Sequence, residues 1–146
     1  KKNKDYFVKK YFEPVIQIKL TKELFKFANS SIDISDGLID DLEKMINKQK
    51  LSYKIWEEQI PISKNLNSYL KMNNLKKSNF ISNGDDYQIL FTASADKTRI
   101  IKNISKKLAI KISKIGKITL NNKKSSFISQ KGKYLLVKNS GYKHQF

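Results

Sequence analysis

The sequence predicts one α+β domain, in which single strands alternate with helices and the chain closes with short hairpin strands. Three observations lead to this prediction. The 146 residues are enough for one domain with a real core and hardly enough for two. Apolar residues switch several times between the alternation of a strand and the spacing of a helix. Turn-forming residues separate these stretches, as at Pro61, Gly84 and Gly132.

The expected elements follow one another without an internal repeat. They are, by residue number, a linker over 1–19, a helix over 20–29, a strand over 31–35, a helix over 36–49, a strand over 51–60, a helix over 63–75, a strand over 87–92, a turn followed by a helix over 93–107, a partly alternating stretch over 108–118, and strands over 126–129 and 134–137.

Apolar spacing identifies the elements of the first half. Helical spacing begins at Leu20 and again at Leu38, and the linker before them combines lysines with an aromatic cluster. Residues 51–60 alternate loosely up to Pro61, which ends that strand. Ser63 has the side chain of an N-cap and starts the next helix, whose expected inward-facing residues are Leu66, Tyr69, Leu70 and Met72.

Turn residues and β-formers divide the second half. Asn83-Gly84 marks a turn, and the residues from Tyr87 to Thr92 are strong β-formers. Isoleucines at 100, 101 and 104 lie along one side of the following helix. The last two short strands are joined by a turn at Lys131-Gly132.

Composition excludes several functions. The chain has no cysteine, so disulfides, thiolate metal sites and cysteine nucleophiles are excluded. No apolar run approaches the length of a membrane span, and the lysine-rich start lacks the apolar core of a signal peptide. The formal charge of +17 comes from lysines spread along the chain, with Arg99 the only arginine. This argues against a nucleic-acid binder, and a non-catalytic basic module that binds RNA is kept as an alternative.

Residues 31–37, Ser-Ile-Asp-Ile-Ser-Asp-Gly, put polar groups where a strand meets a helix. Alternation in the strand buries the isoleucines and points Asp33 and Ser35 to the other face, and Asp36 follows at the start of the helix. Carboxylates, a hydroxyl and helix N-terminal amides gathered there fit a hydrated divalent cation and a phosphate. An ordinary helix start, capped by Ser35 or Asp36, is the alternative. A solvated helix face equally explains the neighbouring Asp40, Asp41 and Glu43.

Two segments resemble signatures of thiamine-monophosphate kinases, and they follow one another along the chain in the same order as in that family. Residues 83–92, Asn-Gly-Asp-Asp-Tyr-Gln-Ile-Leu-Phe-Thr, resemble the family's Gly-Glu-Asp-Tyr-Glu-Leu-Leu-Phe-Thr. Residues 32–38, Ile-Asp-Ile-Ser-Asp-Gly-Leu, match its Asp-x-Ser-Asp-Gly-Leu. Further similar stretches are 10–14, 115–119 and the closing Gly141-Tyr142 with His144 and Phe146. The resemblance covers nearly the whole chain and corresponds to roughly the C-terminal half of the enzyme.

The resemblance implies a layered α/β/α domain with a mixed, largely antiparallel sheet, as in the C-terminal domain of aminoimidazole-ribonucleotide synthetase. Residues 1–19 would be the linker from a missing N-terminal ATP-binding domain, and 20–146 the C-terminal kinase domain. The cytoplasmic enzyme, a homodimer at full length, would transfer the γ-phosphoryl group of ATP in line to thiamine monophosphate. Magnesium and the positioning of the two substrates would bring about the transfer, without a catalytic side chain. Another ATP-dependent member of the superfamily with a different substrate is the alternative.

Site residues carry over from the same resemblance. Asp33 and Asp36 match magnesium ligands, and Ser35 matches an ATP contact. Asp85 matches the glutamate that contacts the thiamine substrate and is one methylene shorter. Asn139 stands where the family often has an aromatic residue that stacks on the substrate ring. The remaining metal ligands and most nucleotide contacts would lie in the N-terminal domain.

Overall fold

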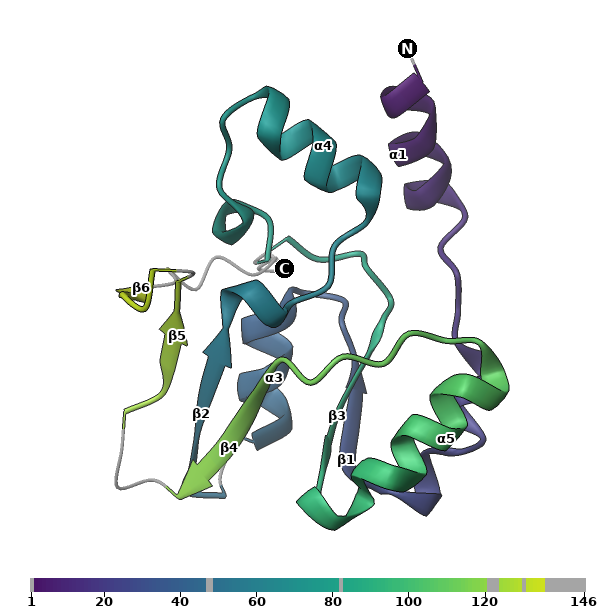
Figure 1. The fold of residues 1–146 in the computed structure, drawn as a ribbon, viewed down its shortest axis with the longest axis vertical. Coiled ribbons are helices and arrows are strands. Elements are labelled where there is room, and N and C mark those ends of the chain that lie inside the picture. The colour runs from purple at the N-terminus through teal and green to yellow at the C-terminus, as the bar shows by residue number, and fades with distance from the viewer. Residues whose placement is uncertain (1, 47–48, 82, 121–123, 130, 136–146) are drawn as a thin grey trace, which may run out of the picture.

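Figure 1 shows the fold in a computed structural model, which describes residues 2–46, 49–81, 83–120, 124–129 and 131–135. The helices are α1 (Lys2–Phe12), α2 (Ile18–Thr21), α3 (Leu38–Ile46), α4 (Lys64–Met72) and α5 (Thr98–Leu108). The strands are β1 (Ala28–Asp33), β2 (Leu51–Trp56), β3 (Ile89–Ala93), β4 (Gly116–Leu120), β5 (Ser126–Ile128) and β6 (Tyr134–Leu135). In these ranges no helix combines the length and the apolar character that crossing a bilayer requires.

The described strands form two sheets. β1 and β3 pair antiparallel, with Ile32 opposite Leu90 and Asp33 opposite Ile89. The other four strands are ordered β4-β2-β5-β6, and their one parallel pair is β2 with β5. The predicted mixed, largely antiparallel strand pattern is confirmed, although the strands divide between two sheets.

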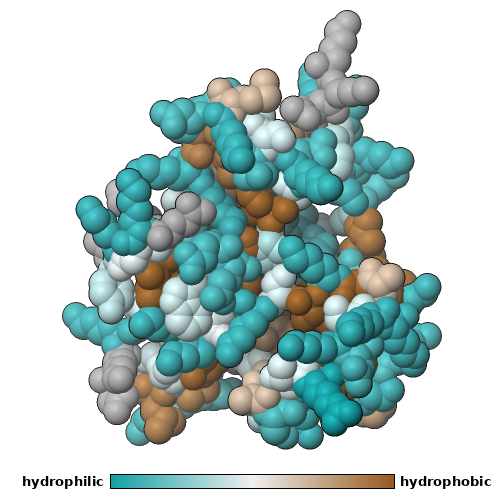
Figure 2. Space-filling view, viewed as in Figure 1, coloured by the Kyte–Doolittle hydropathy of each residue, from teal (hydrophilic) through white to brown (hydrophobic). Residues whose placement is uncertain are grey.

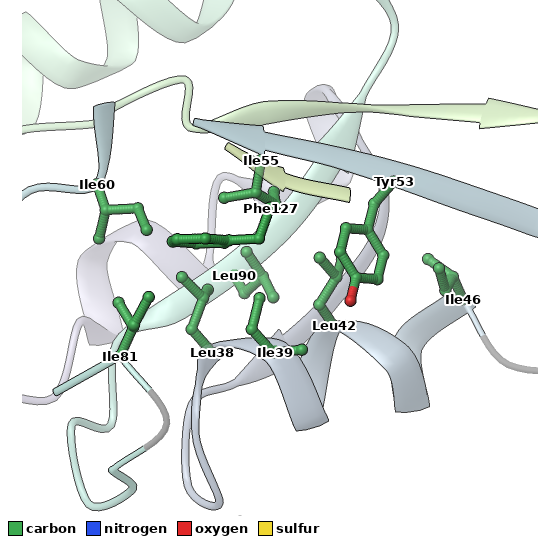
Figure 3. Packing of buried hydrophobic residues seen from close by; sticks show 10 residues of the cluster. All are labelled: Leu38, Ile39, Leu42, Ile46, Tyr53, Ile55, Ile60, Ile81, Leu90 and Phe127. Atoms are coloured by element: carbon green, nitrogen blue, oxygen red, sulfur yellow. The ribbon is translucent and has the colours of Figure 1, made fainter. Parts of the chain in front are cut away.

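The β1–β3 pair lies between two hydrophobic cores. Neighbouring residues of β3 serve opposite faces, so Leu90 belongs to one core and Ile89 and Phe91 to the other. The first core, drawn in Figure 3, joins α3 to both sheets through Leu38, Ile39, Leu42, Ile46, Tyr53, Ile55, Ile60, Ile81, Leu90 and Phe127. The second core packs α5 and the segment before β1 on the opposite face through Leu20, Phe27 and Ile104. Helices therefore cover both faces of this strand pair, as the predicted α/β/α layering requires.

Several boundaries differ from the sequence-based expectation. The helix expected over 20–29 is replaced by the short α2, a 3-10 turn (Leu24–Lys26) and β1, which already begins at Ala28. The strand expected over 51–60 ends at Trp56, because the chain continues as a 3-10 turn (Glu57–Gln59), where the Glu57 carboxylate accepts a hydrogen bond from the Ser78 backbone N–H (3.0 Å). The stretch expected to alternate over 108–118 becomes a strand only from Gly116.

Residues 1–19 contain helix α1, which their composition had not indicated. Asp5 lies in its first turn and Lys9 and Lys10 in its last, where these charges complement the helix dipole. The Phe7 ring meets the Tyr69 ring of α4 edge-on, with 6.0 Å between centroids. The two helices lie side by side in Figure 1.

Helix α4 confirms one local prediction and corrects another. The Ser63 hydroxyl accepts a hydrogen bond from the Leu66 backbone N–H (3.0 Å), as an N-cap does. Leu70 is buried, whereas Met72 is 79% exposed. The expectation that Met72 faces inward is wrong, because it is the last residue of a helix whose buried position is Leu70, and Tyr69, at 38% exposed, is not buried either.

Candidate functional site at the corner between β1 and α3

The corner between β1 and α3 places the predicted polar residues at the edge of the first core. β1 alternates as expected, with Ile32 partly buried and Asp33 exposed at the strand's last position. Ser35 and Asp36 are partly buried, and Gly37 adopts a positive φ of 129° just before α3 begins at Leu38. This φ favours glycine, which explains why a glycine directly precedes the helix.

The Asp41 carboxylate organises this corner from the inside. Its Oδ2 accepts hydrogen bonds from the backbone N–H groups of Ser35 (2.9 Å), Asp36 (2.9 Å) and Gly37 (3.2 Å). The residue is only 1% exposed. Three donors on one buried carboxylate compensate for its removal from water. The reading of Asp41 as part of a solvated face is therefore wrong. The three amides that precede α3 are thus hydrogen-bonded to Asp41, and the phosphate contact expected at this corner stays a prediction.

Lys44 connects Asp41 to Asp36. Its Nζ donates to Oδ1 of Asp41 (2.9 Å) and forms an ion pair with Oδ2 of Asp36. Burial opposes ionisation of Asp41, but Lys44 and the three backbone donors outweigh it and hold the pKa of that carboxyl below its usual value. The two carboxylates in turn raise the pKa of Lys44. Asp41 and Lys44 thus form an ionised, hydrogen-bonded pair at neutral pH, which the Lys44–Asp36 ion pair extends to the surface.

The segment 84–88 is bound to this corner through the backbone. Ile34 N–H donates to the Gln88 carbonyl, Tyr87 N–H to the Ile34 carbonyl and Asp85 N–H to the Ser35 carbonyl, each at 2.9 Å. These bonds continue the β1–β3 pairing beyond the last paired residues of the two strands. The two sequence motifs, about fifty residues apart in the chain, therefore meet backbone to backbone.

Position 84, where the two segments meet, has no room for a side chain, so it requires glycine. A Cβ atom built there lies 1.9 Å from the Ser35 carbonyl oxygen and 3.2 Å from the Asp36 Cα atom. Both are backbone atoms, so a side chain can be accommodated only by moving one segment away from the other.

We expect Gly84→Ala to lower the free energy of unfolding by about 2 kcal/mol, since the overlap forces a backbone shift. It should also separate Asp85 from the corner. Chemical denaturation measures the first effect, and amide exchange at Asp85 and Tyr87 measures the second. Gly132→Ala is a control in open space, although its positive φ of 72° adds a small strain. Unchanged exchange at Asp85 in Gly84→Ala would contradict the prediction.

Asp85, Asp86 and Tyr87 form an irregular, polar turn before β3. Asp85 and Tyr87 have positive φ values of 64° and 49°, so the side chains on either side of Asp86 are turned out of a regular strand. The Tyr87 hydroxyl donates to Oδ1 of Asp85 (3.2 Å). This bond, the Asp85 charge and, to a smaller extent, the charge of Asp33 raise the pKa of Tyr87. Asp33 therefore lies in the same electrostatic neighbourhood as Asp85.

The structure thus brings together four of the five predicted site residues. Asp33, Ser35 and Asp36 lie on the corner, and Asp85 is bonded to Ser35 through the backbone. Asn139 lies outside the described residues, as does the Gly141-Tyr142 ending. Among the side chains that the structure describes, no three of the His, Asp and Glu kind form a group suited to a metal ion.

Sequence reasoning missed Asp41 and Lys44. The position of Asp41 in the helical repeat could have identified it. It is three residues after Leu38 and four before Met45, so it lies beside the apolar face of α3. A carboxylate at that edge of the stripe is expected to point into the protein. Lys44 follows three residues after Asp41 and is its neighbour on the helix surface.

The lowered pKa of Asp41 gives a pH-dependent contribution to stability. Its folded-state pKa lies below the ordinary value of 3.8, so the stabilisation is complete above that pH and is lost as pH falls through the folded-state pKa. We expect the difference in unfolding free energy between the natural chain and Asp41→Asn to shrink as the pH falls below about 5. Urea titrations across this range measure the difference, and a constant value would contradict the assignment.

Comparisons with known proteins first define the class of fold. The thiamine-monophosphate kinase AaThiL complexed with AMPPCP and TMP matches with a TM-score of 0.77 at 23% identity, covering 99% of this chain and 43% of that chain. E. coli HypE, a hydrogenase maturation protein, matches with a TM-score of 0.61 at 8% identity, covering 80% of this chain and 36% of that chain. These two likenesses show the α+β fold alone. No family model matches the chain.

Sequence similarity then gives the family. The thiamine-monophosphate kinase of Buchnera aphidicola subsp. Schizaphis graminum (strain Sg) is 35% identical over 140 residues, which are 96% of this chain and 43% of that protein. The chain is therefore homologous to thiamine-monophosphate kinases along nearly its whole length and corresponds to their C-terminal part. It spans less than half the length of the curated relatives that it matches.

Proposed function

We propose that this chain is the C-terminal domain of a thiamine-monophosphate kinase. The whole protein would transfer the γ-phosphoryl group of ATP to thiamine monophosphate by direct in-line displacement, giving thiamine diphosphate. The observation that carries the proposal is the direct backbone pairing of the two family-like segments, Asp85 N–H to the Ser35 carbonyl at 2.9 Å, in a chain 35% identical to such a kinase. The AaThiL structure complexed with AMPPCP and TMP supports a nucleotide and a second ligand for this fold.

In this proposal Asp33 and Asp36 hold magnesium, and Ser35 contacts ATP. Asp33 is exposed at the end of β1, and the Asp36 side chain is 23% exposed, so both carboxylates reach the surface of the corner. This fits magnesium, which keeps several waters and takes only one or two carboxylates from one element. When bound, the ion would neutralise charge on the phosphate oxygens. The chain itself would position the two carboxylates. A direct in-line transfer needs no nucleophilic side chain.

Substrate recognition is proposed for Asp85 and Asn139. Asp85 is exposed, and its carboxylate is oriented by the Tyr87 hydroxyl (3.2 Å). A fixed anion beside the metal corner is suited to the positively charged ring of thiamine. Asp86 next to it is also exposed, and desolvation together with the Asp85 charge raises its pKa.

The rest of the active site would come from an N-terminal ATP-binding domain, joined through residues 1–19. Exposed apolar side chains are concentrated in this segment, at Val8, Tyr11, Phe12, Val15, Ile16 and Ile18. Most of the face in Figure 2 is hydrophilic by contrast. Apolar side chains gathered in one exposed segment support packing against another domain. We further propose a cytoplasmic homodimer for the full-length enzyme.

The proposal is tested by assaying the full-length protein with ATP, Mg²⁺ and thiamine monophosphate. Formation of thiamine diphosphate is the expected result, and the 146-residue chain alone should be inactive. Other phosphate and carboxylate acceptors are assayed in parallel. Turnover of one of these and none of thiamine monophosphate would reject the proposed substrate.

A second candidate is another ATP-dependent enzyme with the same fold and a different substrate. Two observations favour it: the fold is shared with HypE at a TM-score of 0.61, and Asp85 is shorter than the glutamate of the family's motif. Asp85→Glu separates the candidates. If thiamine monophosphate is the substrate, this variant should retain turnover and lower the KM, because it restores the reach of the family's residue.

A further inference from the structure

Lys44 lies between two carboxylates of different character. Its Nζ donates to Oδ1 of Asp41 at 2.9 Å and is ion-paired with Oδ2 of Asp36. The Asp41 side chain is 1% exposed and the Asp36 side chain is 23% exposed. Asp41 therefore holds Lys44 from the protein interior, and the same ammonium group neutralises Asp36 at the surface.

We propose that Lys44 is a positioning residue that sets the affinity of Asp36 for divalent cations, with its ammonium group acting as a resident counter-ion. This inference rests on the proposed function, in which Asp36 is a magnesium ligand. A cation that binds Asp36 has to share the carboxylate with Lys44 or displace it.

The hydrogen bonds of Asp41 explain why Lys44 stays close when a cation arrives. Asp41 keeps three backbone donors on Oδ2 and offers Oδ1 to Lys44, whether or not Asp36 is engaged. The ammonium charge consequently remains beside the corner. At a separation of about 5 Å in water, a unit positive charge lowers the affinity for a divalent cation by about tenfold.

Lys44→Met removes the charge and keeps much of the side-chain length. Lys26→Met is the matched control, because Lys26 also forms an i, i+3 ion pair, with Glu23, and its side chain is 44% exposed compared with 49% for Lys44. Both variants lower the net charge equally, and Lys26 has no contact with the corner among the described interactions.

The test is a titration of the full-length protein with Mn²⁺ alone, followed by electron paramagnetic resonance of the free ion. We expect Lys44→Met to bind Mn²⁺ about tenfold more tightly than Lys26→Met. The double variant Asp36→Asn/Lys44→Met should lose this gain. Circular dichroism confirms folding of each variant. If Lys44→Met does not fold, Lys44→Gln, which keeps an N–H donor for Asp41, replaces it with the same expected direction.

The outcomes separate this inference from the proposed function. Equal Mn²⁺ affinity of the Lys44 and Lys26 variants overturns the inference, as does a gain that survives Asp36→Asn. Thiamine diphosphate formation by the full-length protein is measured independently. If thiamine diphosphate forms but the Mn²⁺ affinities are equal, only the proposed role of Lys44 is rejected. If no thiamine diphosphate forms, the proposed function is rejected.

Discussion

Replacing Asp33 with asparagine should reduce phosphoryl transfer by the full-length protein by about 100-fold or more, because a proposed magnesium ligand loses its charge. Asp33 is exposed at the last position of β1, and no ion pair of its side chain is present among the described residues. Asparagine keeps the shape of the side chain. The fold should therefore survive while the metal-dependent chemistry fails. The measurement is kcat at saturating ATP, Mg²⁺ and thiamine monophosphate.

Asp96→Asn is the matched control for this experiment. Asp96 precedes α5, its side chain is 69% exposed, and its described ion pair is with the neighbouring Lys97 at 3.7 Å. The same change of one carboxylate to an amide should leave kcat within about twofold, because surface pairs of this kind contribute little. Near-normal turnover of Asp33→Asn, in a protein that folds normally, would falsify the assignment of the corner.

Replacing Asp41 with alanine should lower the free energy of unfolding by about 3 kcal/mol, because three backbone donors lose their buried acceptor. The change removes the acceptor of three backbone N–H groups and leaves Lys44 with only one of its two carboxylate partners. Amide groups that lose their partner away from water cost free energy on their own, which adds to the lost ion pair. Urea denaturation followed by far-ultraviolet circular dichroism measures the effect.

Asp40→Ala is the control on the same turn of α3. Asp40 also lies in the first turn of the helix, but it is only partly buried, so the loss should stay within about 1 kcal/mol, the usual size of a charge–dipole contribution. Equal losses from the two substitutions would mean that helix-end charge, and not the buried network, explains the stability of the corner.

The local pattern of the sequence was sufficient for much of the fold. Alternation of Ile32 and Asp33 predicted their opposite faces in β1, and the hydroxyl of Ser63 predicted the start of α4. Both are consequences of short-range backbone geometry, which neighbouring residues decide. The segment Asp33 to Gly37 was likewise recognisable as a polar corner before its surroundings were known.

The chain by itself therefore determined the order of most strands and helices, the start of α4, which faces are apolar and which family the chain resembles. Only the tertiary structure decided that the segment 84–88 lies against Ser35, that Gly84 has no room for a side chain, and that Asp41 is buried with Lys44 across it. These features depend on antiparallel pairing between strands more than fifty residues apart. Contacts of that range arise from packing of the whole domain, which no local periodicity encodes.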